Sequence, residues 1–241
     1  MKQVTFQDGS IAINGQFPEV IPPFSFPLTF TDPPYGGIIN ETWDDCTADY
    51  LIDWTKAIST VTYPGGAVYI WGGIGTPGNR PFFEYLYRVE KESDMNLSSL
   101  ITWKKKRAYG IQWGFLFTRE ECAYLVKGNI KKPRKFEVPL LAEKRGYEGY
   151  DKNHPAKSEY LRRTNVWTDI TEIFRGKVHP TEKPTALAKI AILAHTVPGE
   201  MVFDPFAGSG STGLAARELG RRFLLIEKDP IIFDKMVERL K

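Results

Sequence analysis

Four consecutive residues, Asp32-Pro33-Pro34-Tyr35, follow a short apolar segment and combine two rigid acceptors with an aromatic ring. The prolines fix φ and remove two backbone donors, so the turn can present the Asp32 carboxylate and the Pro33 carbonyl to a ligand. Two acceptors beside the ring of Tyr35 suit an exocyclic amino group on a planar base such as adenine. Accepting its hydrogens favours a tetrahedral nitrogen, which can attack a methyl group in line. Taken alone, the tetrapeptide also fits an ordinary proline turn.

A second candidate site lies near the C-terminus, where Gly208, Gly210 and Gly213 have the spacing G-x-G-x-x-G between an expected strand and an expected helix. Glycine allows a tight turn and a close approach of the backbone to a ligand. Asp204, just before the glycines, can pair with a cationic amino group, and Glu227 can accept hydrogen bonds from ribose hydroxyls. A dinucleotide carries no such amino group, and its fold needs several more strand–helix units after this turn. The pattern therefore favours a nucleoside cofactor that carries an amino acid.

The elements that must position these two turns alternate along the chain. Strands are expected at residues 4–6, 28–31, 67–71, 100–103, 122–126, 201–203 and 223–226. Helices are expected at residues 48–61, 82–92, 184–195 and 212–219, with a last helix from Pro230. Residues 128–175 are irregular, basic and aromatic. Strands that alternate with helices predict an α/β fold with a mostly parallel sheet covered on both faces.

The composition fits one domain rather than two. The chain has 241 residues and 42% hydrophobic residues, and its net charge is only +3. The basic residues nevertheless gather in two runs in the middle third, one at residues 104–107 and one spread over residues 127–145. Such runs can steer a phosphate backbone, or they can be a solvated face.

Several classes of protein are disfavoured by the residue counts. Cys46 and Cys122 make no disulfide framework, and the three histidines show no metal-ligand spacing, so we expect no metal. The polar N-terminus is no signal peptide, and no apolar run approaches the length of a membrane span. We therefore expect a cytoplasmic protein, associated with the nucleoid if it binds DNA.

These motifs resemble the amino-methyltransferase family of DNA-modifying enzymes, specifically the circularly permuted beta class, over residues 3–127 and 164–240. In that class the Asp-Pro-Pro-Tyr turn precedes the glycine-rich turn, as it does here. Other segments are similar to family motifs, namely Gln7-Asp8-Gly9-Ser10, residues 66–71, residues 100–104, Asn165-Val166-Trp167 and His179-Pro180-Thr181-Glu182-Lys183-Pro184.

The resemblance implies a Rossmann-like, circularly permuted methyltransferase fold and S-adenosyl-L-methionine as cofactor. It assigns catalysis to Asp32, Pro33, Pro34 and Tyr35. The residues that it assigns to the cofactor are Asp8, Gly9, His179, Thr181, Lys183, Asp204, Pro205, Phe206, Gly208, Gly210, Ser211, Thr212, Glu227 and Lys228. An aspartate at position 32 favours adenine N6, because members that act on cytosine N4 usually carry serine there.

A base inside a duplex cannot reach such a turn, so the target adenine must be flipped out of double-stranded DNA or be already unpaired. We expect the catalytic domain to comprise residues 1–127 and 164–241, with residues 128–163 as a small recognition insert. The DNA-binding residues expected in and near it are Lys131, Lys132, Arg134, Lys135, Arg145, Arg162 and Arg163. A homodimer and a cognate restriction endonuclease are further expected partners.

Three alternatives remain open at this stage. The first is the same chemistry on cytosine N4 or on adenine in RNA. The second is methylation of a protein glutamine, which is disfavoured because those enzymes carry Asn-Pro-Pro-Tyr after their cofactor motif. The third is a non-catalytic DNA-binding subunit, which usually loses one of the two turns.

Overall fold

The computed structural model describes residues 2–35, 46–73, 75, 78–110, 113–144, 149–151, 154–155, 158–173 and 182–241. Five helices are described, at Ala48–Thr60 (α1), Pro81–Glu92 (α2), Thr185–His195 (α3), Ser211–Glu218 (α4) and Pro230–Arg239 (α5). The strands of the main sheet are Lys2–Thr5 (β1), Ile11–Asn14 (β2), Phe26–Thr31 (β3), Thr62–Gly72 (β4), Met95–Tyr109 (β5), Phe117–Lys127 (β6), Val166–Trp167 (β11), Met201–Asp204 (β12) and Arg222–Glu227 (β13).

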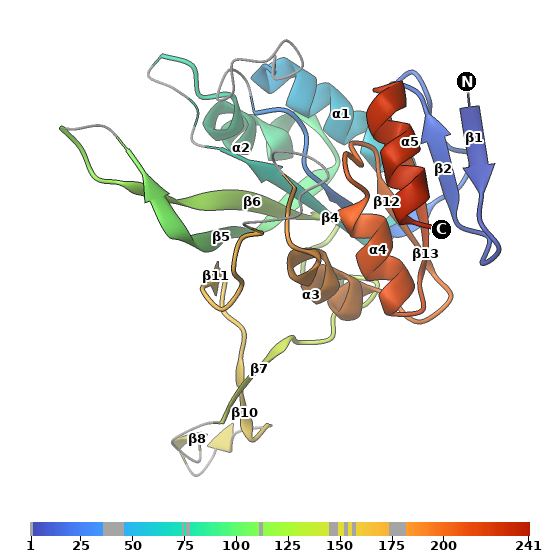
Figure 1. The fold of residues 1–241 in the computed structure, drawn as a ribbon. Helices are drawn as coiled ribbons and strands as arrows, with labels where there is room; N and C mark the ends of the chain where they lie inside the picture. Colours follow the sequence, from blue (N-terminus) through green and yellow to red (C-terminus); the bar gives the residue numbers. More distant parts are fainter. Residues whose placement is uncertain are drawn as a thin grey trace.

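Within the described residues, these strands form one sheet in the order β1-β2-β13-β12-β3-β4-β6-β5-β11 (Figure 1). The five inner strands β2, β13, β12, β3 and β4 are parallel to one another. Strand β6 runs antiparallel to both β4 and β5, and β1 runs antiparallel to β2. The expected mostly parallel α/β fold is confirmed.

Helices cover both faces of the sheet because the central strands are apolar on both sides, as parallel strands usually are. On β4, Tyr69 and Trp71 pack in the same core as α3, α4 and α5, while Val68 and Ile70 pack with α1 and α2. Trp71 and Val68 are both fully buried. The two cores hold the carboxyl ends of β3 and β12 in fixed register, and both candidate turns begin there.

Several strands differ from the expectation. Strand β2 is absent from the sequence prediction, because four residues next to a turn carry little periodic signal. Strands β5 and β6 are much longer than predicted and form a hairpin that extends beyond the rest of the sheet (Figure 1). The long basic stretch of β5 hides this strand, since it lacks an apolar alternation.

The predicted insert contains two small sheets. Leu140–Lys144 (β7) pairs with Tyr160–Arg162 (β10), and Gly149–Asp151 (β8) pairs with His154–Pro155 (β9). Figure 1 shows these strands projecting away from the main sheet. None of the described helices is long and apolar enough to span a bilayer.

Candidate active site

The two turns begin on neighbouring strands. Strand β12 pairs in parallel with β3, with Phe203 opposite Thr29, so both strands end at the same edge of the sheet. There the Thr31 hydroxyl donates a hydrogen bond of 2.8 Å to Oδ1 of Asp204. Asp32 and the glycine turn are therefore neighbours, as a direct transfer between their ligands requires.

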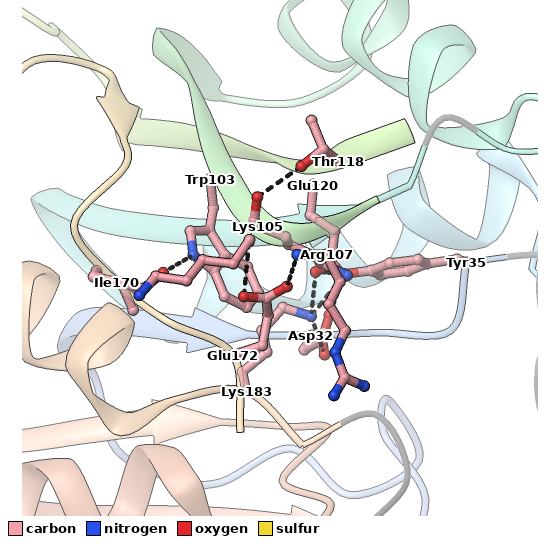
Figure 2. A network of polar contacts seen from close by, with 11 residues as sticks. Asp32, Tyr35, Trp103, Lys105, Arg107, Thr118, Glu120, Ile170, Glu172 and Lys183 are labelled. Atoms are coloured by element: carbon pink, nitrogen blue, oxygen red, sulfur yellow. Dashed lines mark hydrogen bonds and ion pairs between the residues drawn. The ribbon is translucent and has the colours of Figure 1, made fainter. Parts of the chain in front are cut away.

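Lys183 joins the Asp-Pro-Pro-Tyr turn from a distant part of the chain. Its Nζ lies 2.5 Å from Oδ2 of Asp32 and donates to the Tyr35 hydroxyl at 2.8 Å. The Tyr35 hydroxyl in turn donates to Oδ1 of Asp32 at 2.7 Å. Both oxygens of the Asp32 carboxylate are thus oriented by protein donors (Figure 2).

The hairpin strands supply two further charges. Nζ of Lys183 lies 3.1 Å from Oε2 of Glu120 on β6, and the other oxygen of Glu120 forms an ion pair with Lys105 on β5. The four groups alternate in charge, in the order Asp32, Lys183, Glu120, Lys105 (Figure 2). Each buried charge therefore has a partner of opposite sign, which offsets the cost of removing it from water.

The pKa directions follow from this arrangement. Burial raises the pKa of Asp32, and the nearby Lys183 ammonium opposes that rise. Burial also disfavours the charge of Glu120, but Lys183 and Lys105 outweigh it and lower the Glu120 pKa to about 2. Lys183 keeps its proton, because the carboxylates of Asp32 and Glu120 raise its pKa against the effect of burial. The site thus holds Asp32 as an acceptor beside a permanent cation.

The three glycines of the turn have two kinds of environment. Gly208 has a φ of +51°, and a Cβ built there meets no atom within 4 Å, so this position faces open space. Gly210 has a φ of +79°, and its Cβ would lie 2.7 Å from Cγ of Met236 on α5. Gly213 is similarly close to Leu225 on β13. Gly208 therefore leaves room for a ligand, while the other two glycines allow close packing.

Asp204 is a buried carboxylate without a cation. It accepts hydrogen bonds from Thr31 and from the amide of Phe206 at 3.1 Å, but no lysine or arginine of the described residues pairs with it. Burial raises its pKa to about 6. A ligand with an ammonium group would supply the missing countercharge. The Asp204 carboxylate therefore fits the ammonium group at the amino-acid end of S-adenosyl-L-methionine.

Glu227 lies on the other side of the turn. One oxygen accepts from the amide of Gly208 at 2.8 Å, and the other accepts from the amide of Asp229 at 2.9 Å. Burial raises the Glu227 pKa. Each oxygen keeps a second lone pair, so the carboxylate can still accept bonds from ribose hydroxyls.

The structure places Asp8 and Gly9 away from this edge, which corrects the sequence-based grouping. Their turn precedes β2, and β2 runs parallel to β13, so the turn lies where β13 begins rather than where it ends. Asp8 pairs there with Arg217 at 3.4 Å, near the end of α4. Asn14, at the opposite end of β2, is the residue that reaches the site edge, where its amide donates to the Glu227 carbonyl at 2.9 Å.

The remaining residues predicted to bind the cofactor fall into three groups. Lys183 contacts the Asp32 turn instead of the glycine turn, and the Thr212 hydroxyl is buried 3.5 Å from the Phe30 carbonyl. Pro205, Phe206, Ser211 and Lys228 lie in or beside the glycine turn and the end of β13, and their contacts with a cofactor stay predictions. His179 and Thr181 lie outside the described residues.

Sequence reasoning missed Glu120, Lys105 and Glu182. Glu120 and Lys105 are distant in sequence and meet only through the β5–β6 pairing, in which Glu120 lies opposite Trp103. Glu182 is buried next to Lys183 and pairs with Arg239 of α5 at 2.7 Å, with the Ser211 hydroxyl 3.5 Å away. The consecutive residues Glu182 and Lys183 therefore contact the glycine turn and the Asp32 turn, respectively. The only sequence signal for this arrangement is the pair of opposite charges just before Pro184.

Four of the basic residues predicted to bind DNA, from Lys131 to Lys135, lie away from the Asp32 turn. The amide of Arg134 donates to the carbonyl of Gly65 early in β4, and Lys135 donates to the carbonyl of Leu193 late in α3. This segment, with Lys131 and Lys132, therefore lies at the edge of the sheet opposite Asp32. Its contact with DNA stays a prediction.

The other basic residues of the predicted insert vary in their surroundings. Arg134 also forms an ion pair with Glu200, and Arg163 forms two hydrogen bonds with Asp169, at 2.5 and 2.7 Å. Arg162 is exposed on β10. Arg145 lies outside the described residues. Among the described residues of the insert, Arg162 is thus exposed, as are Lys131, Lys132 and Arg134.

Among the residues that the structure describes, no three His, Cys, Asp or Glu side chains gather as a metal site would require.

Solved structures define the class of protein. The chain is similar to the crystal structure of M1.HpyAVI in complex with S-adenosylmethionine, with 25% identity, a TM-score of 0.60 and coverage of 90% of each chain. It shares its fold with the PvuII DNA methyltransferase (cytosine-N4-specific), at 20% identity and a TM-score of 0.73 over 95% of this chain and 86% of that one. The fold and site thus define an S-adenosylmethionine-dependent methyltransferase.

The family follows from sequence comparison. The family model described as DNA methylase matches residues 26–238, so the chain belongs to the DNA methylase family. It is 31% identical to the DNA adenine methyltransferase YhdJ of Escherichia coli, over 86% of this chain and 73% of that protein. It is 29% identical to the Type II methyltransferase M2.DpnII of Streptococcus pneumoniae, over 86% of this chain and 79% of that protein.

Proposed function

We propose that this DNA methyltransferase transfers a methyl group to the exocyclic N6 of adenine in double-stranded DNA. The observation that carries the proposal is the contact between the two turns, in which Thr31, next to Asp32, donates to Asp204. An acceptor for an amine and a binding group for a cationic cofactor therefore lie side by side.

S-Adenosyl-L-methionine supplies an electrophilic methyl group on a sulfonium. Asp204 would pair with its amino group, Glu227 would accept from its ribose hydroxyls, and the open space at Gly208 would admit it against the backbone. Asp204 and Asp32 also place negative charge near the sulfonium.

Asp32 and the carbonyl of Pro33 would accept the two hydrogens of the adenine amine. Lys183 and Tyr35 hold the Asp32 carboxylate in one orientation, so its free lone pairs need no reorganisation when the amine arrives. A nitrogen–carbon bond forms as the sulfur–carbon bond breaks, and the amine nitrogen becomes positively charged. It then loses a proton, which Asp32 is placed to accept.

Two observations favour adenine over cytosine. Position 32 is an aspartate, and one of the similar proteins is named a DNA adenine methyltransferase. Flipping the target base out of the duplex costs a few kcal/mol, which contacts with the DNA backbone and the extruded base must offset. We also propose that the enzyme is cytoplasmic, acts on nucleoid DNA and forms a homodimer. A companion restriction endonuclease is a further proposed partner, because similar proteins are named Type II methyltransferases.

The test uses labelled cofactor and plasmid DNA from a host without methylation. After the reaction, digestion to nucleosides and mass spectrometry distinguish N6-methyldeoxyadenosine from N4-methyldeoxycytidine. We expect the former from the wild type and none from Asp32→Ala, with cofactor binding retained by the variant. N4-methyldeoxycytidine, or methylation of RNA alone, would overturn the proposal. Sequencing the methylated bases then gives the recognition site.

A further inference from the structure

The tip of the β5–β6 hairpin is a cluster of exposed apolar side chains. Trp113 is 88% exposed, Phe115 is 96% exposed, and Leu116 and Phe117 are also exposed. A globular domain normally buries side chains of this size, and their grouping at one tip marks an interaction surface.

The strand that leads to this tip is basic. Lys104, Lys106 and Arg107 of β5 are exposed, while Lys105 between them turns inward to Glu120. Both oxygens of Glu172 accept from the β5 backbone, at 2.9 Å from the amide of Lys106 and 3.0 Å from that of Arg107 (Figure 2). The hairpin is therefore held to the body at its base, where these exposed basic residues lie, and its far end is apolar.

The base of the hairpin is also joined to the catalytic turn. Lys105 and Glu120 come from its two strands, and Glu120 contacts Lys183 at 3.1 Å, which contacts Asp32 at 2.5 Å. Beyond Lys104 the pairing is interrupted by an irregularity, and Tyr109 then pairs with Phe117. A two-stranded ribbon has a width that the major groove of DNA accepts. The tip therefore extends from the site at which the target base must arrive.

We propose that the β5–β6 hairpin is a DNA-binding arm, whose basic strand contacts phosphates and whose aromatic tip stacks on bases of the duplex beside the extruded adenine. This proposal rests on the proposed function and names the element that separates the target base from its neighbours. Aromatic rings stack on any exposed base, and apolar wedges stabilise unstacked base steps. Duplex DNA is favoured over a second copy of the chain, because a symmetric contact between two arms would bring like charges together.

The first test compares the double variant Trp113→Ala/Phe115→Ala with wild type on unmethylated plasmid DNA, either native or heat-denatured. We expect the variant to be roughly 10- to 100-fold slower on native DNA and within about threefold of wild type on denatured DNA, where no base has to be unstacked from a duplex. Tyr87→Ala is the matched control, since Tyr87 is an exposed aromatic on α2, and should match wild type on both. No loss on native DNA, or an equal loss on both forms, would overturn the role of the tip.

The second test needs no methylation. Binding to a duplex oligonucleotide is measured against salt concentration for Lys104→Glu/Lys106→Glu and for Lys131→Glu/Lys132→Glu at the opposite edge. We expect the first pair to lower the salt slope by about two and the second to leave it unchanged. An unchanged slope in the first pair would refute the arm. The proposal would also be refuted if wild type is a dimer, Trp113→Ala/Phe115→Ala is a monomer, and both bind DNA equally well. If wild type methylates neither DNA form, the proposed function fails. The salt dependence of binding then tests by itself whether the hairpin binds DNA.

Discussion

The hydroxyl of Thr31 donates a hydrogen bond of 2.8 Å to Oδ1 of Asp204, and this bond ties the end of β3 to the end of β12. Asp32 follows Thr31 directly, and its charge contributes to the raised pKa of Asp204. The carboxylates of Asp32 and Asp204 therefore lie close together, and the Lys183 ammonium pairs with Asp32 and Glu120 but not with Asp204. Asp204 therefore lacks a countercharge, which the ammonium group of the cofactor would bring.

Cofactor affinity should therefore depend on the ionisation of Asp204. Since burial raises its pKa to about 6, the carboxylate is ionised at pH 8 and protonated at pH 5. We expect the dissociation constant of S-adenosylmethionine, measured by calorimetry, to be lowest near pH 7 and to rise by about tenfold per pH unit well below 6.

Asp204→Asn provides the control for that titration. The amide oxygen can still accept from Thr31 and from the Phe206 amide, so the turn keeps its hydrogen bonds. The variant should bind the cofactor weakly at pH 8 and show little change down to pH 5. A variant that retains the wild-type pH dependence would remove Asp204 from this role.

The same substitution should stabilise the protein without cofactor. The pKa of Asp204 in the fold lies above that of an ordinary aspartate, so ionisation penalises the folded state. The penalty is absent below about pH 4 and complete above about pH 7. We expect Asp204→Asn to gain up to about 3 kcal/mol in the free energy of unfolding at pH 8, and the gain to disappear towards pH 4. Urea unfolding at the two pH values measures it, and an equal gain at both would contradict the assignment.

Lys183→Met should reduce methyl transfer more than cofactor binding. Without the ammonium, burial and the charge of Glu120 both raise the pKa of Asp32, and its carboxylate loses the donor on Oδ2. We expect kcat at pH 7.5 to fall by roughly 10- to 100-fold and the acid limb of the kcat profile to move to higher pH. Rates measured from pH 5 to 9 test this.

The double variant Lys183→Met/Glu120→Gln separates charge from packing. Removing the Glu120 charge takes away the repulsion that Asp32 meets once Lys183 is lost. The double variant should therefore recover part of the activity lost by Lys183→Met and return the acid limb towards lower pH. If the fold-loss of rate in the double variant equals the product of the fold-losses in Lys183→Met and Glu120→Gln, the two groups are not coupled. The alternation of charge then has no catalytic role.

The sequence was sufficient for the fold and for the two turns, because both turns are local patterns bounded by apolar strands. It was insufficient wherever a contact depends on strand register. Glu120 and Lys105 meet only through the β5–β6 pairing. The resemblance assigns Asp8 to the cofactor, but the pairing of β2 with β13 places it at the opposite edge of the sheet. Charge alone did not reveal that Lys131 and Lys132 lie at the far edge of the sheet, while Lys104 and Lys106 lie on the hairpin beside the site.

The glycine turn allows a last contrast between two substitutions at positions of positive φ. In Gly210→Ala the new methyl would lie 2.7 Å from Cγ of the buried Met236 and 3.1 Å from Leu240, so strain and overpacking add. We expect a loss of about 2–4 kcal/mol in stability, and a fall in Tm of more than about 5 °C.

Gly208→Ala meets no atom within 4 Å, so it should cost only about 1–2 kcal/mol of backbone strain. Its methyl fills the space into which the cofactor would enter, so the dissociation constant of S-adenosylmethionine should rise at least about tenfold. Thermal unfolding and calorimetry on both variants measure the two effects. A ligand in contact with the backbone at Gly208 would clash with a methyl group there. If Gly208→Ala binds the cofactor as wild type does, the open space beside Gly208 is therefore not the binding site.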